Sequence, residues 1–145
     1  MLELVDADAL LTNCVKAKFG DGAQRTNRED ESVRVAFELA AGAWELREPG
    51  GGTPRFLEVV RDRVQAALLD QERVAELVPQ KVNIYEAGGF FVDHVDTPVD
   101  PRHMVGTLVV CLPCVHTGGA LVVKHNEGDV RFDFAGESGA PTRRI

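Results

Sequence analysis

The sequence contains few cysteines and no long apolar run. Its three cysteines, Cys14, Cys111 and Cys114, are too few for a disulfide framework and fit a reducing compartment. No apolar run approaches the roughly 20 residues that a membrane-spanning helix needs. Glu3 and Asp6 interrupt the start of the chain, which excludes a secretory signal. We therefore expect a soluble intracellular protein, cytoplasmic and without a membrane partner.

Basic residues are also scarce, with 16 Lys and Arg against 23 Asp and Glu, for a net charge of −7. An acidic chain without a basic stripe does not neutralise phosphates, so we exclude nucleic acid as a direct partner. The 44% hydrophobic and 27% charged residues are ordinary for a globular protein. A length of 145 residues indicates one domain, or a piece of one, with its own core.

The residue pattern of the first half of the chain predicts mainly helix. Helical spacing predicts a helix over residues 6–18, and the polar stretch 23–32 predicts a loop. Residues 33–46 fit both a strand and a helix, and their alternation favours a strand. After the Gly-rich break at 50–52, an apolar stripe predicts a long helix over 54–78.

Beyond Pro79 the spacing of apolar residues changes from that of a helix to the alternation typical of strands. Short runs separated by Gly, Pro, Asp and Asn predict antiparallel strands over 81–86, 90–96, 106–112, 119–125 and 129–134. The expected class is α+β, with N-terminal helices followed by an antiparallel β-rich region. The expected organisation is a supporting segment over 1–79, a β-rich segment over 80–134 and an unpacked tail over 135–145.

His94 and Asp96 form the most informative pair. Residues two apart on a strand point to the same face, so this imidazole and this carboxylate are expected to project together. They would supply two corners of a 2-His-1-carboxylate triad, which leaves positions on Fe(II) open for an oxoacid and O₂. Taken alone, His-x-Asp is common and usually marks a surface strand with two polar groups.

An ordered set of motifs surrounds this pair. The set is Tyr85-Glu86-x-Gly88-Gly89-Phe90-Phe91, then His94-x-Asp96-Thr97-Pro98, Gly106-Thr107-Leu108-Val109-Val110-Cys111-Leu112-Pro113, Thr117-Gly118-Gly119-Ala120-Leu121-Val122-Val123 and Phe132-Asp133-Phe134. In this order the motifs resemble the catalytic core of the 2-oxoglutarate- and Fe(II)-dependent oxygenases of the prolyl 4-hydroxylase type. The resemblance covers roughly a third of the chain, and Phe19-Gly20, Val33-Arg34 and Trp44 resemble the lead-in of that family more loosely.

The resemblance implies a fold and an activity. The fold would be the first half of a double-stranded β-helix, or jelly roll, with supporting helices. The activity would be that of a hydroxylating dioxygenase that uses Fe(II), 2-oxoglutarate as co-substrate and ascorbate as reductant, on a small-molecule or peptide substrate. His94 and Asp96 would hold iron, and Tyr85 would reach the 2-oxoglutarate carboxylate.

Further pocket positions follow from the same resemblance. Val109, Cys111 and Leu121 match residues that line the 2-oxoglutarate pocket, although alternating apolar residues on strands are more often core. The family also has a second metal histidine and a basic residue, and their positions fall beyond Ile145. We therefore expect a dioxygenase, or a C-terminally truncated form of one, and the alternative is a catalytically inactive jelly-roll module whose open sheet edge a partner chain covers.

Three other histidines are candidate metal ligands, and one cysteine pair is a candidate redox site. His103 and His116 lie in expected loops and His125 ends an expected strand, so none is assigned as the third ligand. Cys111-Leu112-Pro113-Cys114 suggests thiol redox chemistry, but that chemistry needs its first cysteine at a helix N-terminus. Zinc and haem attachment lack the required ligand spacing.

Overall fold

The computed structural model describes residues 7–21, 26–48, 50–69, 75–96, 98, 100, 102–126, 128–135 and 142–143. Over these residues it contains two helices and several short antiparallel strands in small sheets. This is the mixed α+β arrangement that the sequence predicts.

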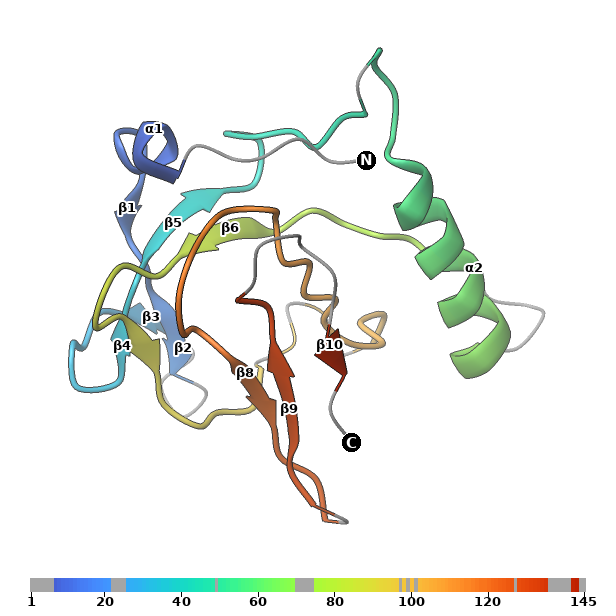
Figure 1. Cartoon of the computed structure of the whole chain (residues 1–145). Helices are drawn as coiled ribbons and strands as arrows, with labels where there is room; N and C mark the ends of the chain where they lie inside the picture. Colours follow the sequence, from blue (N-terminus) through green and yellow to red (C-terminus); the bar gives the residue numbers. More distant parts are fainter. Residues whose placement is uncertain are drawn as a thin grey trace.

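The central ladder joins the two halves of the chain (Figure 1). Strand β5 (Phe37–Ala40) pairs with β6 (Lys81–Ile84) on one side and with β1 (Val15–Lys16) on the other. Just before β5 in the chain, β4 (Arg34–Val35) pairs with β7 (Phe90–Phe91). The segment expected over 1–79 therefore shares a sheet with the segment expected over 80–134.

The register of this ladder contains a large interruption. Phe37 faces Ile84, whereas Val35 faces Phe90. Ala36 alone therefore stands opposite the five residues from Tyr85 to Gly89, which form a tight loop. The loop displaces β7 from β6 and carries the chain toward His94.

The N-terminal region differs from its prediction. Helix α1 spans only Ala7–Leu11, and β1 follows where the helix was expected to continue to residue 18. Ala17 N donates to Ala36 O at 2.9 Å, so pairing with β5 prevails over local helical spacing. Part of the expected loop is also a strand, since β3 (Thr26–Arg28) pairs with β2 (Phe19–Asp21).

Helix α2 (Arg55–Leu68) begins where predicted but ends ten residues earlier than residue 78. Leu69 is already extended, with φ −117° and ψ 149°, and residues 75–80 are not helical. Ala75 N donates to the side-chain Oε1 of Gln65 at 2.7 Å. This bond ties the returning chain to the helix and directs it toward β6.

The C-terminal sheet has the order β10-β9-β8. Strands β8 (Leu121–Val123) and β9 (Val130–Asp133) confirm two of the expected strands. Strand β10 (Thr142–Arg143) pairs with β9, so part of the expected tail is packed. Within the region 135–145, residues 136–141, 144 and 145 lie outside the described residues.

Two expected strands are short or absent in the described residues. Residues 90–96 contain only the two-residue β7, although Val92 N still donates to Val33 O at 3.0 Å. Residues 106–112 contain no strand. A strand exists only beside a hydrogen-bonded partner, and the described chain places none next to this apolar segment.

Burial is concentrated in the first half of the chain. The buried hydrophobic residues are small apart from one leucine: Ala17, Ala36, Leu39 and Ala75, with Pro54 fully enclosed. Among residues 75–135, none beyond Ala75 whose side chain the structure describes is buried, and many valines there are largely exposed. The core therefore lies against the central ladder, and the β8–β9 region is open on its faces.

Candidate metal site

A glycine turn positions the aromatic strand that precedes the candidate site. Gly89 N donates to Glu86 O at 2.8 Å, and Gly88 has φ +79°, as the third position of a type II turn requires. A Cβ on Gly89 would lie 3.0 Å from the carbonyl oxygens of Glu86 and Val35. The two glycines of the Gly-Gly-Phe-Phe motif therefore allow β7 to approach β4 closely.

The structure brings His94 and Asp96 together. His94 Nε2 lies 3.5 Å from Asp96 Oδ1, with the two side chains 40% and 52% exposed. Two cis ligands each about 2.0–2.2 Å from one metal ion would be about 3 Å apart, so a shift of about half an ångström would suffice. Neither residue lies in a strand, so their proximity does not depend on a strand ladder at residues 94–96.

The imidazole of His94 is oriented for ligation through Nε2. Its Nδ1 lies 2.8 Å from the carbonyl oxygen of Val92. A carbonyl only accepts, so Nδ1 carries the proton and donates this bond, and Nε2 keeps the lone pair that a metal needs. A backbone carbonyl that holds the second ring nitrogen is the usual support of a metal-binding histidine.

The ring of Phe91 covers His94, and it is in turn contacted by an arginine that motif reasoning did not single out for the site. The Phe91 and His94 rings stack with centroids 3.6 Å apart and planes at 19°. The Arg34 guanidinium carbon lies 4.6 Å from the Phe91 centroid. The only sequence signal for Arg34 was its place in the loosely matching Val33-Arg34 lead-in.

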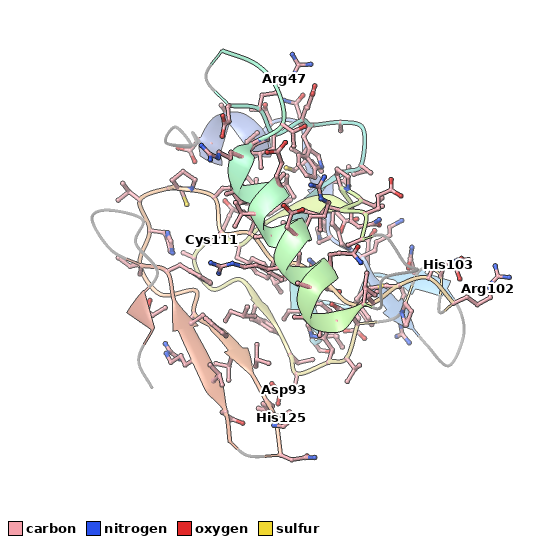
Figure 2. All side chains as sticks on the ribbon, turned by 90° about the vertical axis from the view of Figure 1, so that its right-hand side faces the viewer. Arg47, Asp93, Arg102, His103, Cys111 and His125 are labelled. Carbon is pink, nitrogen blue, oxygen red and sulfur yellow. The ribbon has the colours of Figure 1, made fainter. Side chains whose placement is uncertain are left out.

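An ion pair attaches the site segment to the C-terminal sheet. Lys124 Nζ donates to Asp93 Oδ2, and this bond raises the pKa of Lys124 above its ordinary value. Asp93 and His125 lie together at one end of the molecule in Figure 2, whereas Cys111 and His103 lie apart from them. The end of β8 is thus linked to the loop that carries His94.

The other histidines have local partners. His103 Nδ1 lies 2.8 Å from Asp100 Oδ2, within the turn that precedes residue 104. His116 Nδ1 lies 3.0 Å from Cys114 O and 3.6 Å from Cys114 Sγ. Within the described parts of the chain, no three His, Cys, Asp or Glu side chains converge as a metal site would require. A third ligand for His94 and Asp96 is therefore not assigned.

The cysteine pair does not have the environment of a redox-active thiol. No helix begins at Cys111, which lies in an extended stretch, and its Sγ donates to Leu112 O at 3.7 Å. Desolvation, and next the charge of Cys114, raises the pKa of the Cys111 thiol above its ordinary value. A raised pKa leaves less thiolate at neutral pH, the opposite of what a reactive cysteine needs.

The expected pocket residues are exposed and placed on different segments. Tyr85 begins the glycine loop, is 44% exposed and accepts a long bond of 3.5 Å from Arg34 Nη2. Val109 is 60% exposed and Cys111 is also exposed, both outside any strand. Leu121 lies on β8 opposite Phe132. Their role in holding 2-oxoglutarate remains a prediction.

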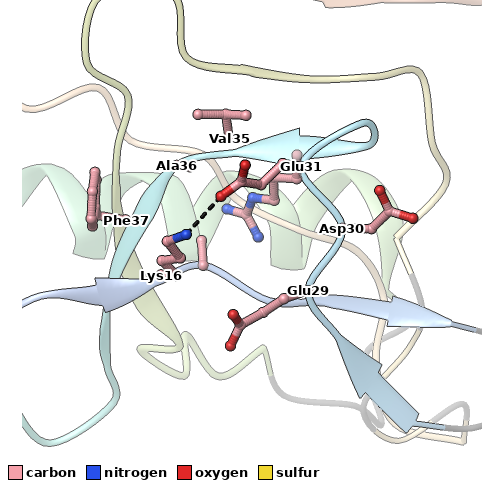
Figure 3. A pocket seen from close by; sticks show the side chains of 9 residues that line it. Lys16, Glu29, Asp30, Glu31, Val35, Ala36 and Phe37 are labelled. Carbon is pink, nitrogen blue, oxygen red and sulfur yellow. Dashed lines mark hydrogen bonds and ion pairs between the residues drawn. The ribbon is translucent and has the colours of Figure 1, made fainter.

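A recess of about 160 Å³ lies elsewhere, between β1 and the segment before β4 (Figure 3). Its acidic residues already have partners: Glu31 with Lys16 at 2.6 Å, Glu29 with Lys18 at 3.7 Å, and Asp30 with the Ser32 hydroxyl at 2.6 Å. These bonds lower the pKa values of Glu31 and Asp30. The acidic side chains of the recess are thus paired, and the recess does not include the candidate ligands.

Comparison with protein-family models, curated proteins and solved structures finds no match to this chain. In the described residues, no helix is both long and apolar enough to cross a membrane. The assignment of a function therefore depends on the residues themselves.

Proposed function

We propose that the chain carries the iron-binding half of a non-haem Fe(II)- and 2-oxoglutarate-dependent dioxygenase core, with His94 and Asp96 as two metal ligands. The observation that carries this proposal is the 3.5 Å separation between His94 Nε2 and Asp96 Oδ1. The bond from Nδ1 to Val92 O supports it, because it leaves Nε2 available. The ordered motifs from Tyr85 to Phe134, which resemble those of this family, support the proposal.

The donor set fits two corners of the proposed centre. One neutral imidazole and one carboxylate are the mixed N and O ligands that Fe(II) takes in a 2-His-1-carboxylate site. Bound iron with 2-oxoglutarate supplies oxygen activation for C–H hydroxylation. The chain itself would hold the metal at Nε2 and Oδ1 and orient the imidazole through Val92. The exposure of both ligands predicts weak binding, since affinity depends on ligand number and on a supporting shell.

A second candidate function has its own support. The described residues provide no third ligand, and Val122 and Val123 of β8 and Val105 and Val109 are exposed. A jelly-roll half that has lost the triad and serves as a protein-interaction module would show both features. A partner chain would then cover the open strands, and metal binding would be absent.

Calorimetric titration with Mn(II), a redox-inert substitute for Fe(II), tests the first candidate. We expect saturable binding by the wild-type chain, tighter when 2-oxoglutarate is present, and its loss in His94→Ala. His103→Ala is the matched control, because this histidine is engaged with Asp100 and should leave binding unchanged. Absence of binding by a folded chain would reject the metal site and favour the interaction module.

A further inference from the structure

Three side chains form a continuous column from the interior of the ladder to the candidate metal site. The Phe91 and His94 ring centroids are 3.6 Å apart, and the Arg34 guanidinium carbon lies 4.6 Å from the Phe91 centroid. A stacked imidazole fills one face of the phenyl ring, which leaves the opposite face to the guanidinium. The order from inside to outside is therefore Arg34, Phe91, His94.

Arg34 is the fixed end of this column. The Arg34 side chain is 3% exposed, against 40% for the His94 side chain. Arg34 Nη1 donates to Lys18 O at 2.7 Å, and Nη2 donates to Asn83 Oδ1 at 2.7 Å. Glu38 Oε2 lies 3.9 Å from Nη1 and balances the charge. A planar guanidinium held by two short bonds has little freedom, so it presents a rigid surface to the ring.

Phe91 needs such a surface because its strand is short. Strand β7 has two residues, and Phe91 pairs with Arg34 across the ladder. The other aromatic neighbour, Phe19, is tilted at 52° with its centroid 6.3 Å away. The guanidinium is thus the nearer contact, and an arginine over an aromatic face is attracted by the ring quadrupole as well as by packing.

We propose that Arg34 is a positioning residue for the candidate metal site, which it serves by holding Phe91 against the imidazole of His94. This role rests on the proposed function, since His94 matters as a ligand only if a metal binds there. Arg34 touches neither ligand atom. Its effect is to limit rotation of the imidazole so that Nε2 stays beside Asp96 Oδ1, while the Val92 carbonyl fixes the other nitrogen.

The imidazole proton shifts of His94 in the metal-free chain test this role directly. Protons stacked on a phenyl face are shifted upfield by its ring current, so the His94 protons should lie upfield of those of the other three histidines. Phe91→Leu should remove this shift. Arg34→Met should move the His94 proton shifts most of the way to their values in Phe91→Leu. The proton shifts of His116 and His125 should stay unchanged in both variants.

Three further variants distinguish positioning by Arg34 from a general loss of structure. Asn83→Ala removes one anchor of Arg34 at an exposed position, and it should move the His94 shift part of the way even if Arg34→Met fails to fold. Arg61→Met removes a helix arginine that pairs with Asp62, and it should change nothing. Phe19→Leu should have a smaller effect than Arg34→Met. The proposal would be overturned if Phe19→Leu and Arg34→Met changed the His94 shift equally. It would also be overturned if the His94 shift stayed the same in both Arg34→Met and Asn83→Ala.

Metal affinity gives the functional readout. Loss of a residue that supports a metal-binding histidine typically weakens binding 10–100-fold. We expect about tenfold weaker Mn(II) binding for Phe91→Leu and Arg34→Met, and a smaller loss for Asn83→Ala. Unchanged affinity despite a moved His94 shift would overturn the positioning role. A wild-type chain that binds no Mn(II) would instead reject the proposed function, and the metal-free shifts would still report whether Arg34 holds the stack.

Discussion

Gly89 and Val35 approach so closely that a side chain does not fit between them. A Cβ at Gly89 would lie 3.0 Å from the carbonyl oxygen of Val35 and equally close to that of Glu86. Val35 belongs to β4 and Glu86 to the loop before β7, and both contacts are with backbone atoms, so an added Cβ requires the strand or the loop to shift. The second glycine of the Gly-Gly-Phe-Phe motif is therefore a packing requirement as well as a turn residue.

We expect Gly89→Ala to destabilise the chain by about 1–3 kcal/mol, the usual cost of overpacking a tight contact. Gly106→Ala is the matched control, since a Cβ there meets nothing within 4 Å. Urea unfolding followed by circular dichroism measures both. Equal stability of the two variants would show that the β4–β7 approach is looser than described.

Glu48 should stabilise helix α2 from outside the helix. Its Oε1 accepts a bond of 2.7 Å from Arg55 N, one of the amides that the first turn leaves unpaired, while Pro54 offers no side-chain cap. Glu48→Ala should cost about 0.5–2 kcal/mol, as loss of an N-terminal cap does. Glu45→Ala, which removes only an exposed partner of Arg47, should leave thermal unfolding unchanged. A lower melting temperature in Glu45→Ala alone would contradict this cap.

Asp100 should titrate below its ordinary range because of His103. The His103 side-chain bond, and next the Arg102 backbone N–H, lowers the pKa of the Asp100 carboxyl. A lowered folded pKa means that this interaction contributes stability above the ordinary Asp pKa, and the contribution is lost as the pH falls through the lowered value. His103→Gln should raise the pKa of Asp100 in a carbon-detected NMR titration. An unchanged pKa of Asp100 in His103→Gln would show that His103 does not bond to Asp100. His103 would then again be a candidate metal ligand.

Cys111 should react slowly with alkylating agents. Its pKa is raised by desolvation and by the charge of Cys114, so the thiolate fraction at neutral pH is below that of an ordinary cysteine. The alkylation rate should be lower than that of free cysteine at pH 7 and should rise steeply with pH. Cys114→Ser removes the smaller cause, so the rate should increase modestly. A fast reaction at neutral pH would restore the thiol redox hypothesis.

Local spacing was enough to predict that the His94 and Asp96 side chains lie together, but not the structure around them. The side chains of His94 and Asp96 lie close together as expected, although the expected strand over 90–96 ends at Phe91. The Arg34–Phe91 contact depends on a register between strands 57 positions apart, which one sequence does not specify. The early end of the first helix has the same cause, because Ala17 pairs with Ala36.

The central claim is that a divalent metal binds at His94 and Asp96, and paramagnetic line broadening by Mn(II) tests it residue by residue. We expect substoichiometric Mn(II) to broaden the signals of residues 94 and 96 first, then those of Phe91, and to spare His103 and His116. His94→Ala should abolish this pattern without changing the spectrum elsewhere. Broadening confined to the acidic stretch 29–31, or spread evenly over the surface of this −7 chain, would contradict the metal site.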